Sequence, residues 1–509
     1  MISPYLMALL GVRTTMVLVG VISAGLLARI VEGCRGVRRP LLPSLWGAFA
    51  LACNAGSGRV TFGLGLLFAL VVVALVFTEW PAWLPFRQLR MPGIVLCSAL
   101  ATAGSPVAGL FLEVVAAALF LQRKRRIACA VALPFPVVIA LSAWLFPFQG
   151  VQPMPLLSGL IPIVCSAAVY VLSPREWRTV RIGSVVYAGG TLATMVIPSQ
   201  VGLNVERLAL IFGGTVLLAA VDHNRGRTQR RVWYLTAAWL AFAGLASWQA
   251  AKPVVDVVLT TPTAAWTSKD LAPLIHQLKK VDADRGRIEV VPVRSHREAA
   301  ALTPYVNLAR GWNRQADVDR GGIFYDGTLD RHSYQAWLKH WAVRYVVLPM
   351  TDRLDTGAAE EAELVSSGLP YLEQIWSDAN WRVFRVKDPT SLVDPPAAVE
   401  RADESELVIT AKSKGDVLIR VRHSPWLGLV DAEGERVEQP EVLPGSRSQS
   451  LPPQGEGGVR ERSESGQLYL NRHGCLTQAG DWTRLHAPRP GTYRITALYQ
   501  VPRGTPCPE

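Results

Sequence analysis

The first 250 residues are divided into about ten apolar segments, and the loops between them alternate between basic and nearly uncharged. An apolar segment of about 20 residues is long enough for one helical membrane span. The expected spans are residues 5–29, 41–55, 60–78, 91–103, 105–121, 127–148, 154–172, 180–198, 204–221 and 231–250. Segments 41–55 and 91–103 are short, so either could be a re-entrant element whose backbone is buried in protein.

The positive charge of every second loop orients these segments. The basic loops contain Arg29, Arg35, Arg38 and Arg39; Arg87 and Arg90; Arg123, Lys124, Arg125 and Arg126; Arg175, Arg178 and Arg181; and Arg225, Arg227, Arg230 and Arg231. An excess of Lys and Arg near the ends of spans marks the cytoplasmic side. With ten spans, we expect a multi-pass protein of the cell membrane whose N-terminus and C-terminal half are extracytoplasmic.

The net charge is divided unequally between the two halves. Before residue 251 there are 20 Lys and Arg against 6 Asp and Glu, a balance of +14, and after it 32 against 34, a balance of −2. The basic residues therefore belong to loops beside an anionic membrane leaflet. A basic face on a soluble domain is not indicated, which argues against nucleic acid as a partner.

The exported half is expected to contain two domains. Residues 265–390 alternate between strand and helix patterns, which predicts an α/β domain over residues 251–390, after the membrane domain of residues 1–250. The expected strands are 287–293, 343–349 and 380–386, and the expected helices are 295–309, 333–341 and 358–368. Residues 391–509 contain short strands separated by turn residues, which predicts a β-sandwich-like domain. Residues 440–466 are rich in Pro, Gly, Ser and Gln and are expected to form a mobile loop.

Cys475 and Cys507 are the two cysteines of the exported half. An oxidising compartment allows them to form a disulfide that holds the C-terminal tail, and the alternative is two unpaired thiols. No spacing of Cys and His suggests a zinc site, and we predict no metal.

The first candidate site lies at the expected outer face of the membrane. Apart from the basic loops, the membrane half contains three basic residues, namely Arg13, Arg59 and Arg207. Polar residues expected at a similar depth are Asn54, Gln149, Gln152, Asn204 and Glu206. Since arginine forks suit phosphate, we predict a lipid-phosphate site formed by Arg59, Asn204, Glu206 and Arg207. The alternative is interfacial anchoring, or a surface pair of Arg207 with Glu206.

Glu113 is a second candidate because it lies in the middle of an apolar segment. A carboxylate is costly there and marks a functional position, either as a proton carrier or as the partner of a basic residue. The alternative is a neutral, hydrogen-bonded Glu that faces the interior of the bundle.

The third candidate follows the expected helix 295–309. Residues 308–317 and 323–327 are dense in groups that bind sugars, because a Trp ring covers a pyranose face while Arg, Gln and Asp bind hydroxyl groups. The predicted sugar or acceptor residues are Arg310, Trp312, Arg314, Gln315, Asp317 and Tyr325. The alternative is a packing loop. His296 is expected to be a hydrogen-bonded histidine near a helix start.

Several enzyme classes lack their motifs in this chain. It contains no GxSxG, Walker loop, GxGxxG after a strand, HExxH or CxxC. Hydrolase, ATPase, nicotinamide-dependent and metalloprotease functions are therefore not indicated.

The overall pattern resembles the GT-C superfamily of multi-pass membrane glycosyltransferases. The segment of residues 417–437 is similar to the "strand–PxW–xxxVDG" segment that closes many such proteins, and residues 487–500 are similar to their last strand. RGWNRQ and VRYVVLP resemble segments of actinobacterial integral membrane proteins of this type. The resemblance implies a cell-envelope glycosyltransferase that uses a polyprenyl-phosphate sugar and a glycan acceptor.

One departure concerns the catalytic acid, which in that superfamily lies in the first exported loop. Here no Asp or Glu precedes Glu32, which falls in an expected cytoplasmic loop. An internal start at Met1, with a span and its acidic loop upstream, would explain this, and so would a non-catalytic relative. We assign no catalytic residue and no cofactor, and a divalent metal is expected only with such a loop. The alternative functions are a membrane transporter and a non-catalytic envelope scaffold or sugar-binding protein.

Overall fold

The computed structural model describes residues 2–79, 86–147, 150–152, 154–224, 231–403, 405–437, 441–442, 459–462, 468–471 and 473–508. The chain forms two compact units, a helical unit of Met1–Leu259 and a C-terminal unit of Thr260–Glu509. The candidate Gln149, the basic residues Arg225, Arg227 and Arg230, and most of the expected loop 440–466 lie outside the described residues.

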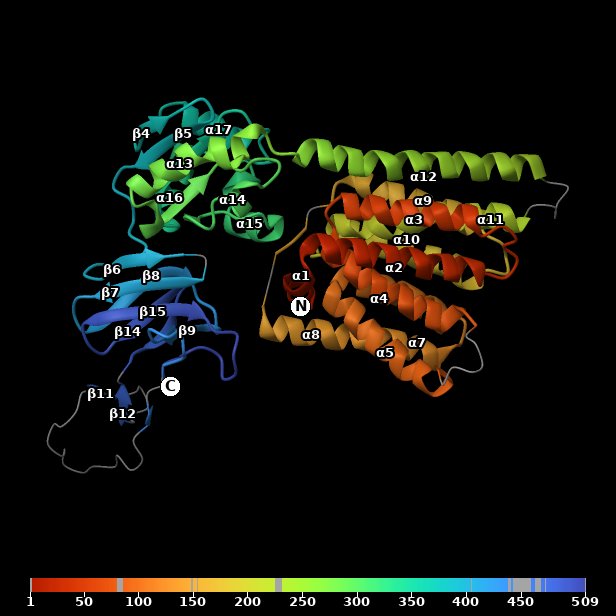
Figure 1. The fold of residues 1–509 in the computed structure, drawn as a ribbon, viewed down its shortest axis with the longest axis horizontal. Coiled ribbons are helices and arrows are strands. Elements are labelled where there is room, and N and C mark those ends of the chain that lie inside the picture. Colours follow the sequence, from red (N-terminus) through yellow and green to blue (C-terminus); the bar gives the residue numbers. More distant parts are fainter. Residues whose placement is uncertain are drawn as a thin grey trace. The chain divides into compact units, whose positions relative to one another are not determined.

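The helical unit is a bundle in which long helices lie side by side (Figure 1). Its helices are α1 (Ser3–Leu10), α2 (Val12–Glu32), α3 (Leu41–Gly56), α4 (Val60–Phe77), α5 (Phe86–Gly104), α6 (Pro106–Leu121), α7 (Arg125–Ala132), α8 (Pro134–Leu145), α9 (Leu156–Leu172), α10 (Arg178–Val196), the 3₁₀ helix η1 (Gly202–Glu206), α11 (Arg207–Asn224) and α12 (Arg231–Thr260). Many large apolar side chains of this unit are exposed, as in a protein that contacts lipid.

The expectation of about ten spans is confirmed only in part. Helical structure lies at each of the ten expected positions, but in the described part of the chain four helices are long and apolar enough to cross a membrane. These are Val12–Glu32, Val60–Phe77, Arg125–Leu145 and Gly202–His223. Three further apolar helices, α3, α6 and α9, are shorter than a full span. The two short segments suspected of being re-entrant are the continuous helices α3 and α5.

Glycine and proline determine how α4, α5 and α6 meet. Gly104 ends α5 and Pro106 begins α6, because proline suits the first turn of a helix and breaks its interior. A Cβ atom on Gly65 would lie 2.8 Å from the carbonyl oxygen of Ala101, and one on Gly104 would lie 3.0 Å from the Cα atom of Gly65. Helices α4 and α5 therefore approach closely only because both positions are glycine.

The last helix of this unit is longer than expected. Helix α12 continues to Thr260, beyond the predicted end at residue 250, and the unit ends at Leu259. Lys252 and Asp256 are therefore part of the bundle, although the sequence placed them after it.

The C-terminal unit begins with an α/β layer. Its five-stranded sheet has the order β2-β1-β3-β5-β4. Strands β2, β1 and β3 pair in parallel, and β5 pairs antiparallel with both β3 and β4. The strands are β1 (Arg287–Val290), β2 (Asn307–Leu308), β3 (Val343–Pro349), β4 (Leu372–Ser377) and β5 (Trp381–Val386). The helices are α13 (Ser268–Lys280), α14 (Glu298–Ala301), α15 (Arg314–Arg320), α16 (Arg331–His340) and α17 (Ala359–Ser366). One apolar core contains residues of α13, and a second contains residues of α16 and α17.

The predicted helix 295–309 is wrong over most of its length. Only Glu298–Ala301 is helical, and β2 follows at Asn307. Pro304 lies between them, and proline in a helix interior removes a hydrogen bond and clashes with the preceding turn. The other two helices of this domain are confirmed as α16 and α17.

The rest of the unit is rich in antiparallel strands. The sheets β6-β7-β15-β9 and β13-β14-β8 share one apolar core, as in a β-sandwich, and β10-β12-β11 form a third, small sheet. The strands are β6 (Ala398–Ala402), β7 (Glu406–Ala411), β8 (Gly415–Arg422), β9 (Leu427–Val430), β10 (Glu441–Val442), β11 (Val459–Arg462), β12 (Leu468–Asn471), β13 (Cys475–Ala479), β14 (Trp482–Ala487) and β15 (Gly491–Ala497). Trp482 of β14 packs on Trp341, with ring centroids 5.4 Å apart, which joins the sandwich to the α/β layer.

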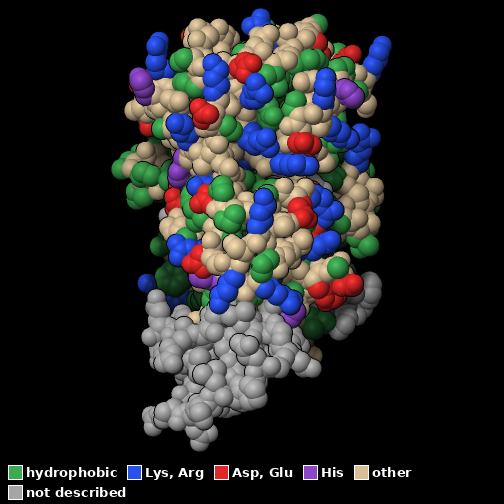
Figure 2. Space-filling view, turned by 90° about the vertical axis from the view of Figure 1, so that its left-hand side faces the viewer, with side chains coloured by type: hydrophobic (Ala, Val, Ile, Leu, Met, Phe, Trp, Pro, Cys, Tyr) green, Lys and Arg blue, Asp and Glu red, His purple; other side chains and the backbone are tan. Residues whose placement is uncertain are grey.

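The surface of the C-terminal unit carries both signs of charge. Figure 2 shows Lys and Arg side chains interspersed with Asp and Glu over the visible face. This agrees with the nearly balanced count for the second half of the chain.

Candidate functional site

A cluster of five charged residues lies at one end of the helical unit. It contains Arg59, Glu206, Arg207, Lys252 and Asp256, and we call it the bundle-end cluster. Arg59 Nη2 lies 3.2 Å from Asp256 Oδ2, and Lys252 Nζ lies 3.3 Å from Glu206 Oε1 and 4.0 Å from Asp256 Oδ1. Three cations therefore face two carboxylates, an arrangement with one positive charge in excess.

Arg207 carries that excess. Its guanidinium lies over the ring of Phe62, 4.9 Å from the centroid, and makes no ion pair or hydrogen bond with any residue that the structure describes. Glu206, its neighbour in the chain, is buried and paired with Lys252. The alternative of an exposed surface pair of Arg207 with Glu206 is therefore wrong.

Unsatisfied polar atoms lie near the cluster. Asn54 and Arg59 line a cavity of about 20 Å³, enough for one water molecule. The buried Oδ1 of Asn54 and Oε1 of Gln249 have no hydrogen-bond partner among the described residues. Gln249 lies one turn before Lys252 on α12, at the same end of the bundle.

The other residues of this predicted site are more loosely connected to it. Asn204 is half-buried in η1, two residues before Glu206, and no contact joins its side chain to the cluster among the described residues. The backbone N–H of Gln152 donates to the carbonyl oxygen of Ser199, so Gln152 lies beside the segment that leads to η1.

An apolar groove shares two helices, α11 and α12, with the bundle-end cluster. It has a volume of about 230 Å³, and its lining residues come from α3, α11 and α12. They are Leu42, Leu45, Trp46, Phe49, Leu218, Trp239 and Phe242. The ring of Phe242 packs against those of Trp46 and Trp239, at centroid distances of 4.8 and 5.7 Å.

Glu113 is half-buried in the middle of α6. Its Oε1 is buried without a hydrogen-bond partner in the described part of the chain, so the structure does not show the neutral, hydrogen-bonded alternative.

In the C-terminal unit, Arg310 is the centre of a buried ionic network. Its Nε and Nη2 donate to the two carboxylate oxygens of Asp317, each over 2.8 Å, and its Nη1 donates to Glu361 Oε2 over 2.8 Å. Glu289 Oε1 lies 3.7 Å from the same Nη1. The hydroxyl of Tyr334 donates to Glu361 Oε1 over 2.9 Å. Arg310 is therefore paired with buried acidic residues and is not free to bind a sugar.

Burial controls protonation in this network. Burial, with the nearby Glu361 adding to it, raises the pKa of Glu289 well above its ordinary value. Burial also raises the pKa of Glu361, to about 7, although Arg310 and Tyr334 oppose it. Burial acts in the same direction on Asp317, but the hydrogen bonds from Arg310 prevail and its pKa is lowered.

The remaining predicted sugar residues are Trp312, Arg314, Gln315 and Tyr325. Tyr325 donates its hydroxyl to Asp317 and accepts from Arg314 Nη1 over 2.7 Å, so it belongs to the network. Trp312 is 68 % exposed, and Gln315 is half-buried on α15. Arg314 reaches the carboxylate of Asp355, which also accepts from Arg294 over 3.1 Å.

Sequence reasoning missed several of these residues. Lys252 and Asp256 were placed beyond the last span. For Glu289 the sequence does contain a signal, because a carboxylate interrupts the β-branched run of residues 287–293. Strand alternation places its side chain on the opposite face of the strand from those of its two neighbours. Asp355 and Glu361 had none, because their arginine partners are more than 40 residues away in the chain.

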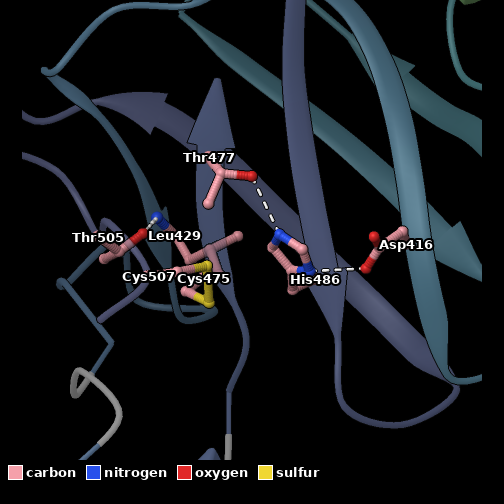
Figure 3. Close-up of a disulfide and its surroundings, with 7 residues drawn as sticks. All are labelled: Asp416, Leu429, Cys475, Thr477, His486, Thr505 and Cys507. Carbon is pink, nitrogen blue, oxygen red and sulfur yellow. Dashed lines mark hydrogen bonds and ion pairs between the residues drawn. A yellow bond between two sulfur atoms is a disulfide. The ribbon is translucent and has the colours of Figure 1, made fainter. Parts of the chain in front are cut away.

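The C-terminal segment is held against the sandwich by a disulfide. Cys475 of β13 is bonded to Cys507, and beside it the hydroxyl of Thr505 accepts from the backbone N–H of Leu429 over 3.0 Å (Figure 3). On the neighbouring strands, His486 contacts Asp416 through Nδ1 at 2.6 Å and Thr477 through Nε2 at 3.0 Å (Figure 3). These polar contacts tie β13, β14 and β8 together. In the described residues, no group of three His, Cys, Asp or Glu could hold a metal ion.

Comparison with known proteins assigns a family description to the sandwich only. A family model described as a domain of unknown function (DUF8823) matches residues 394–509. No curated protein matches the chain. The match takes in β6 to β15 and none of the helical unit.

Proposed function

We propose that this protein is an integral membrane protein that binds a phosphate-bearing lipid, with the phosphate at the bundle-end cluster and the hydrocarbon chain in the apolar groove. The single observation that carries the proposal is that α11 and α12 contribute to both features, while α3 lines the groove and places Asn54 in the cavity beside Arg59. Helix α3 brings Asn54, α11 begins with Arg207, and α12 contributes Lys252, while all three line the groove.

The spacing along these helices suits one lipid molecule. Leu218 follows Arg207 by eleven residues on α11, and Phe242 precedes Lys252 by ten on α12. At a rise of 1.5 Å per residue, both separations are about 15 Å. The groove therefore begins within one lipid length of the charged cluster.

The charges of the cluster support an anionic head group. Arg207 has no carboxylate partner in the described chain, and a guanidinium fork suits phosphate oxygens. Both carboxylates are paired, Glu206 with Lys252 and Asp256 with Arg59. They would shape the site rather than act as a base, so the proposal concerns binding. A polyprenyl-phosphate sugar of the cell envelope is the lipid that the resemblance to GT-C proteins favours.

We further propose that all ten helical segments lie in the membrane, with the N-terminus and the C-terminal unit outside the cytoplasm. The alternating basic loops support this orientation. It would place the bundle-end cluster at the outer leaflet, because Arg59 and Arg207 lie in the loops without basic clusters.

Substitution of Arg207 tests the head-group site. Lipid binding is measured on purified protein in nanodiscs with a polyprenyl phosphate, and with a polyprenol as the uncharged comparison. Arg207→Gln should weaken phosphate binding by about tenfold or more, the worth of one charge-assisted hydrogen bond, and leave polyprenol binding unchanged. Arg13→Gln is the matched control, since Arg13 is exposed at the start of α2 and outside the cluster.

A second variant tests the groove in the same assay. Leu218→Trp should obstruct it and weaken the binding of both lipids, whereas Val185→Trp, on the exposed face of α10, should have no effect. Wild-type binding by both Arg207→Gln and Leu218→Trp would reject the proposal.

A further inference from the structure

We propose that the C-terminal unit contains a separate oxyanion site, for a phosphate or carboxylate group of a ligand, formed by Arg294, His296 and Arg314 around Asp355. The site lies where the loops after three parallel strands meet. Arg294 and His296 follow β1, Arg314 follows β2, and Asp355 follows β3. In open α/β sheets, ligands bind at the carboxyl ends of parallel strands.

Backbone hydrogen bonds hold the loops together without a ligand. The N–H of Arg294 donates to the carbonyl oxygen of Arg353 over 2.7 Å, and that of Asp355 donates to Pro292 over 2.9 Å. Arg314 Nη1 donates to the carbonyl oxygen of Thr356 over 3.0 Å, which attaches the third loop. The cationic side chains are therefore preorganised, which reduces the entropic cost of binding.

Asp355 pairs with two arginines, and some N–H groups of these arginines make no contact with a described residue. Its buried carboxylate accepts from Arg294 Nη1 and Arg314 Nη2, one on each oxygen, and His296 Nε2 lies 3.7 Å away. The carboxylate of Asp355 is thus shared by two guanidinium groups, and a second carboxylate, that of Glu298, faces His296. Nε and Nη2 of Arg294 and Nε of Arg314 have no partner in the part of the chain that the structure describes. The side chains of Arg294 and His296 are 39 % and 27 % exposed, so solvent reaches them.

The loop after β1 has two further properties of a binding site. His296 has a φ of +48°, a strained value for a residue other than glycine, and such residues concentrate at functional sites. Glu298 is 4 % exposed and pairs with His296 Nδ1 through Oε1, but its Oε2 has no hydrogen-bond partner among the described residues. The buried Oγ of Ser295 likewise has none in the described chain.

Arginine footprinting on the wild-type full chain tests the site without a variant. The protein in detergent is treated with phenylglyoxal, with and without inorganic phosphate or glucuronate, and modified peptides are quantified by mass spectrometry. At least one of the two anions should slow the modification of Arg294 by about tenfold. Arg385, which is 54 % exposed and paired with Glu373, is the internal control and should react at an unchanged rate. The anion that protects identifies the ligand group, and protection by neither at millimolar concentration would overturn the proposal.

Variants give an independent measurement by equilibrium dialysis of the protecting anion. Arg294→Gln should weaken binding by about tenfold, and Arg385→Gln should not. The background variant Arg207→Gln should leave this binding intact, which separates it from the head-group site in the helical unit. If Arg294→Gln binds as tightly as wild type, the site is rejected whatever the lipid experiment shows.

Discussion

Glu289 illustrates how one residue can make a folded domain sensitive to pH. It is fully buried on β1, and neither carboxylate oxygen has a hydrogen bond with a described residue. Its neighbour Glu361 shares the single guanidinium of Arg310. Two carboxylates beside Asp317 exceed what one cation can neutralise, so at least one of the acids is most stable in its protonated form.

Glu289 and Glu361 have pKa values raised above those of the unfolded chain, to about 7 for Glu361. Their contribution to stability is present at low pH and is lost as the pH rises through the folded-state values. We expect the C-terminal unit to be less stable at pH 8 than at pH 5.5. Glu289→Gln, which cannot ionise, should reduce this difference and raise the free energy of unfolding of the unit at pH 8.

Pulse proteolysis in urea at the two pH values measures this difference. Glu363→Gln, at an exposed carboxylate on α17, is the control and should retain the wild-type pH dependence. A Glu289→Gln protein with the wild-type pH dependence would contradict the assignment.

At the scale of elements, the C-terminal segment behaves as an added strand of the sandwich. Leu476 N–H donates to the carbonyl oxygen of Thr505 over 2.9 Å, and Cys507 N–H donates back to Leu476 over 3.2 Å. The disulfide joins the segment to β13 across 32 residues of chain. It restricts the unfolded chain over a loop that includes β14 and β15, so its loss should affect the whole sandwich.

The double variant Cys475→Ser/Cys507→Ser should lower the free energy of unfolding of the sandwich by about 3–4 kcal/mol, the loop-closure entropy of a 32-residue loop. Urea unfolding of reduced and oxidised protein, with non-reducing peptide mapping, provides the measurement. Cys129→Ser, at an exposed free thiol of the helical unit, should have no effect on the sandwich. Two free thiols in the oxidised protein would contradict the prediction.

In the whole molecule, the distribution of charge differs between an apolar helical bundle and a polar C-terminal unit. The bundle exposes many large apolar side chains and has its basic residues in alternate loops, whereas the C-terminal unit carries balanced charge. The alternating basic loops support the proposed orientation, which can be tested on the whole chain.

The orientation predicts which loops a membrane-impermeant thiol reagent can reach in intact cells. Gln200→Cys, at an exposed position before η1, should be labelled from outside, and Lys124→Cys, in a basic loop, only after permeabilisation. A chain with its other cysteines replaced by serine is the background. The reverse pattern of labelling would show that the membrane orientation is inverted.

The positions of the helical segments, the main strands and the break between α5 and α6 can be predicted from the amino-acid sequence. These follow from hydropathy, β-branched runs and the local effects of Gly and Pro, which act within a few residues. The sequence also located Arg59 and Arg207 as exceptional cations, and Arg310 as part of a polar group.

Which of these charges are available depends on how the helices and strands pack. Lys252 neutralises Glu206 and leaves Arg207 without a carboxylate among the described residues, because packing places α12 beside η1. Arg310 is enclosed by acids from β1 and α17, while Arg294 and Arg314 remain accessible around Asp355. Ion pairs between distant segments depend on helix and strand packing, which no local pattern encodes. Burial and charge pairing are properties of the assembled core, so they appear only when distant segments pack together.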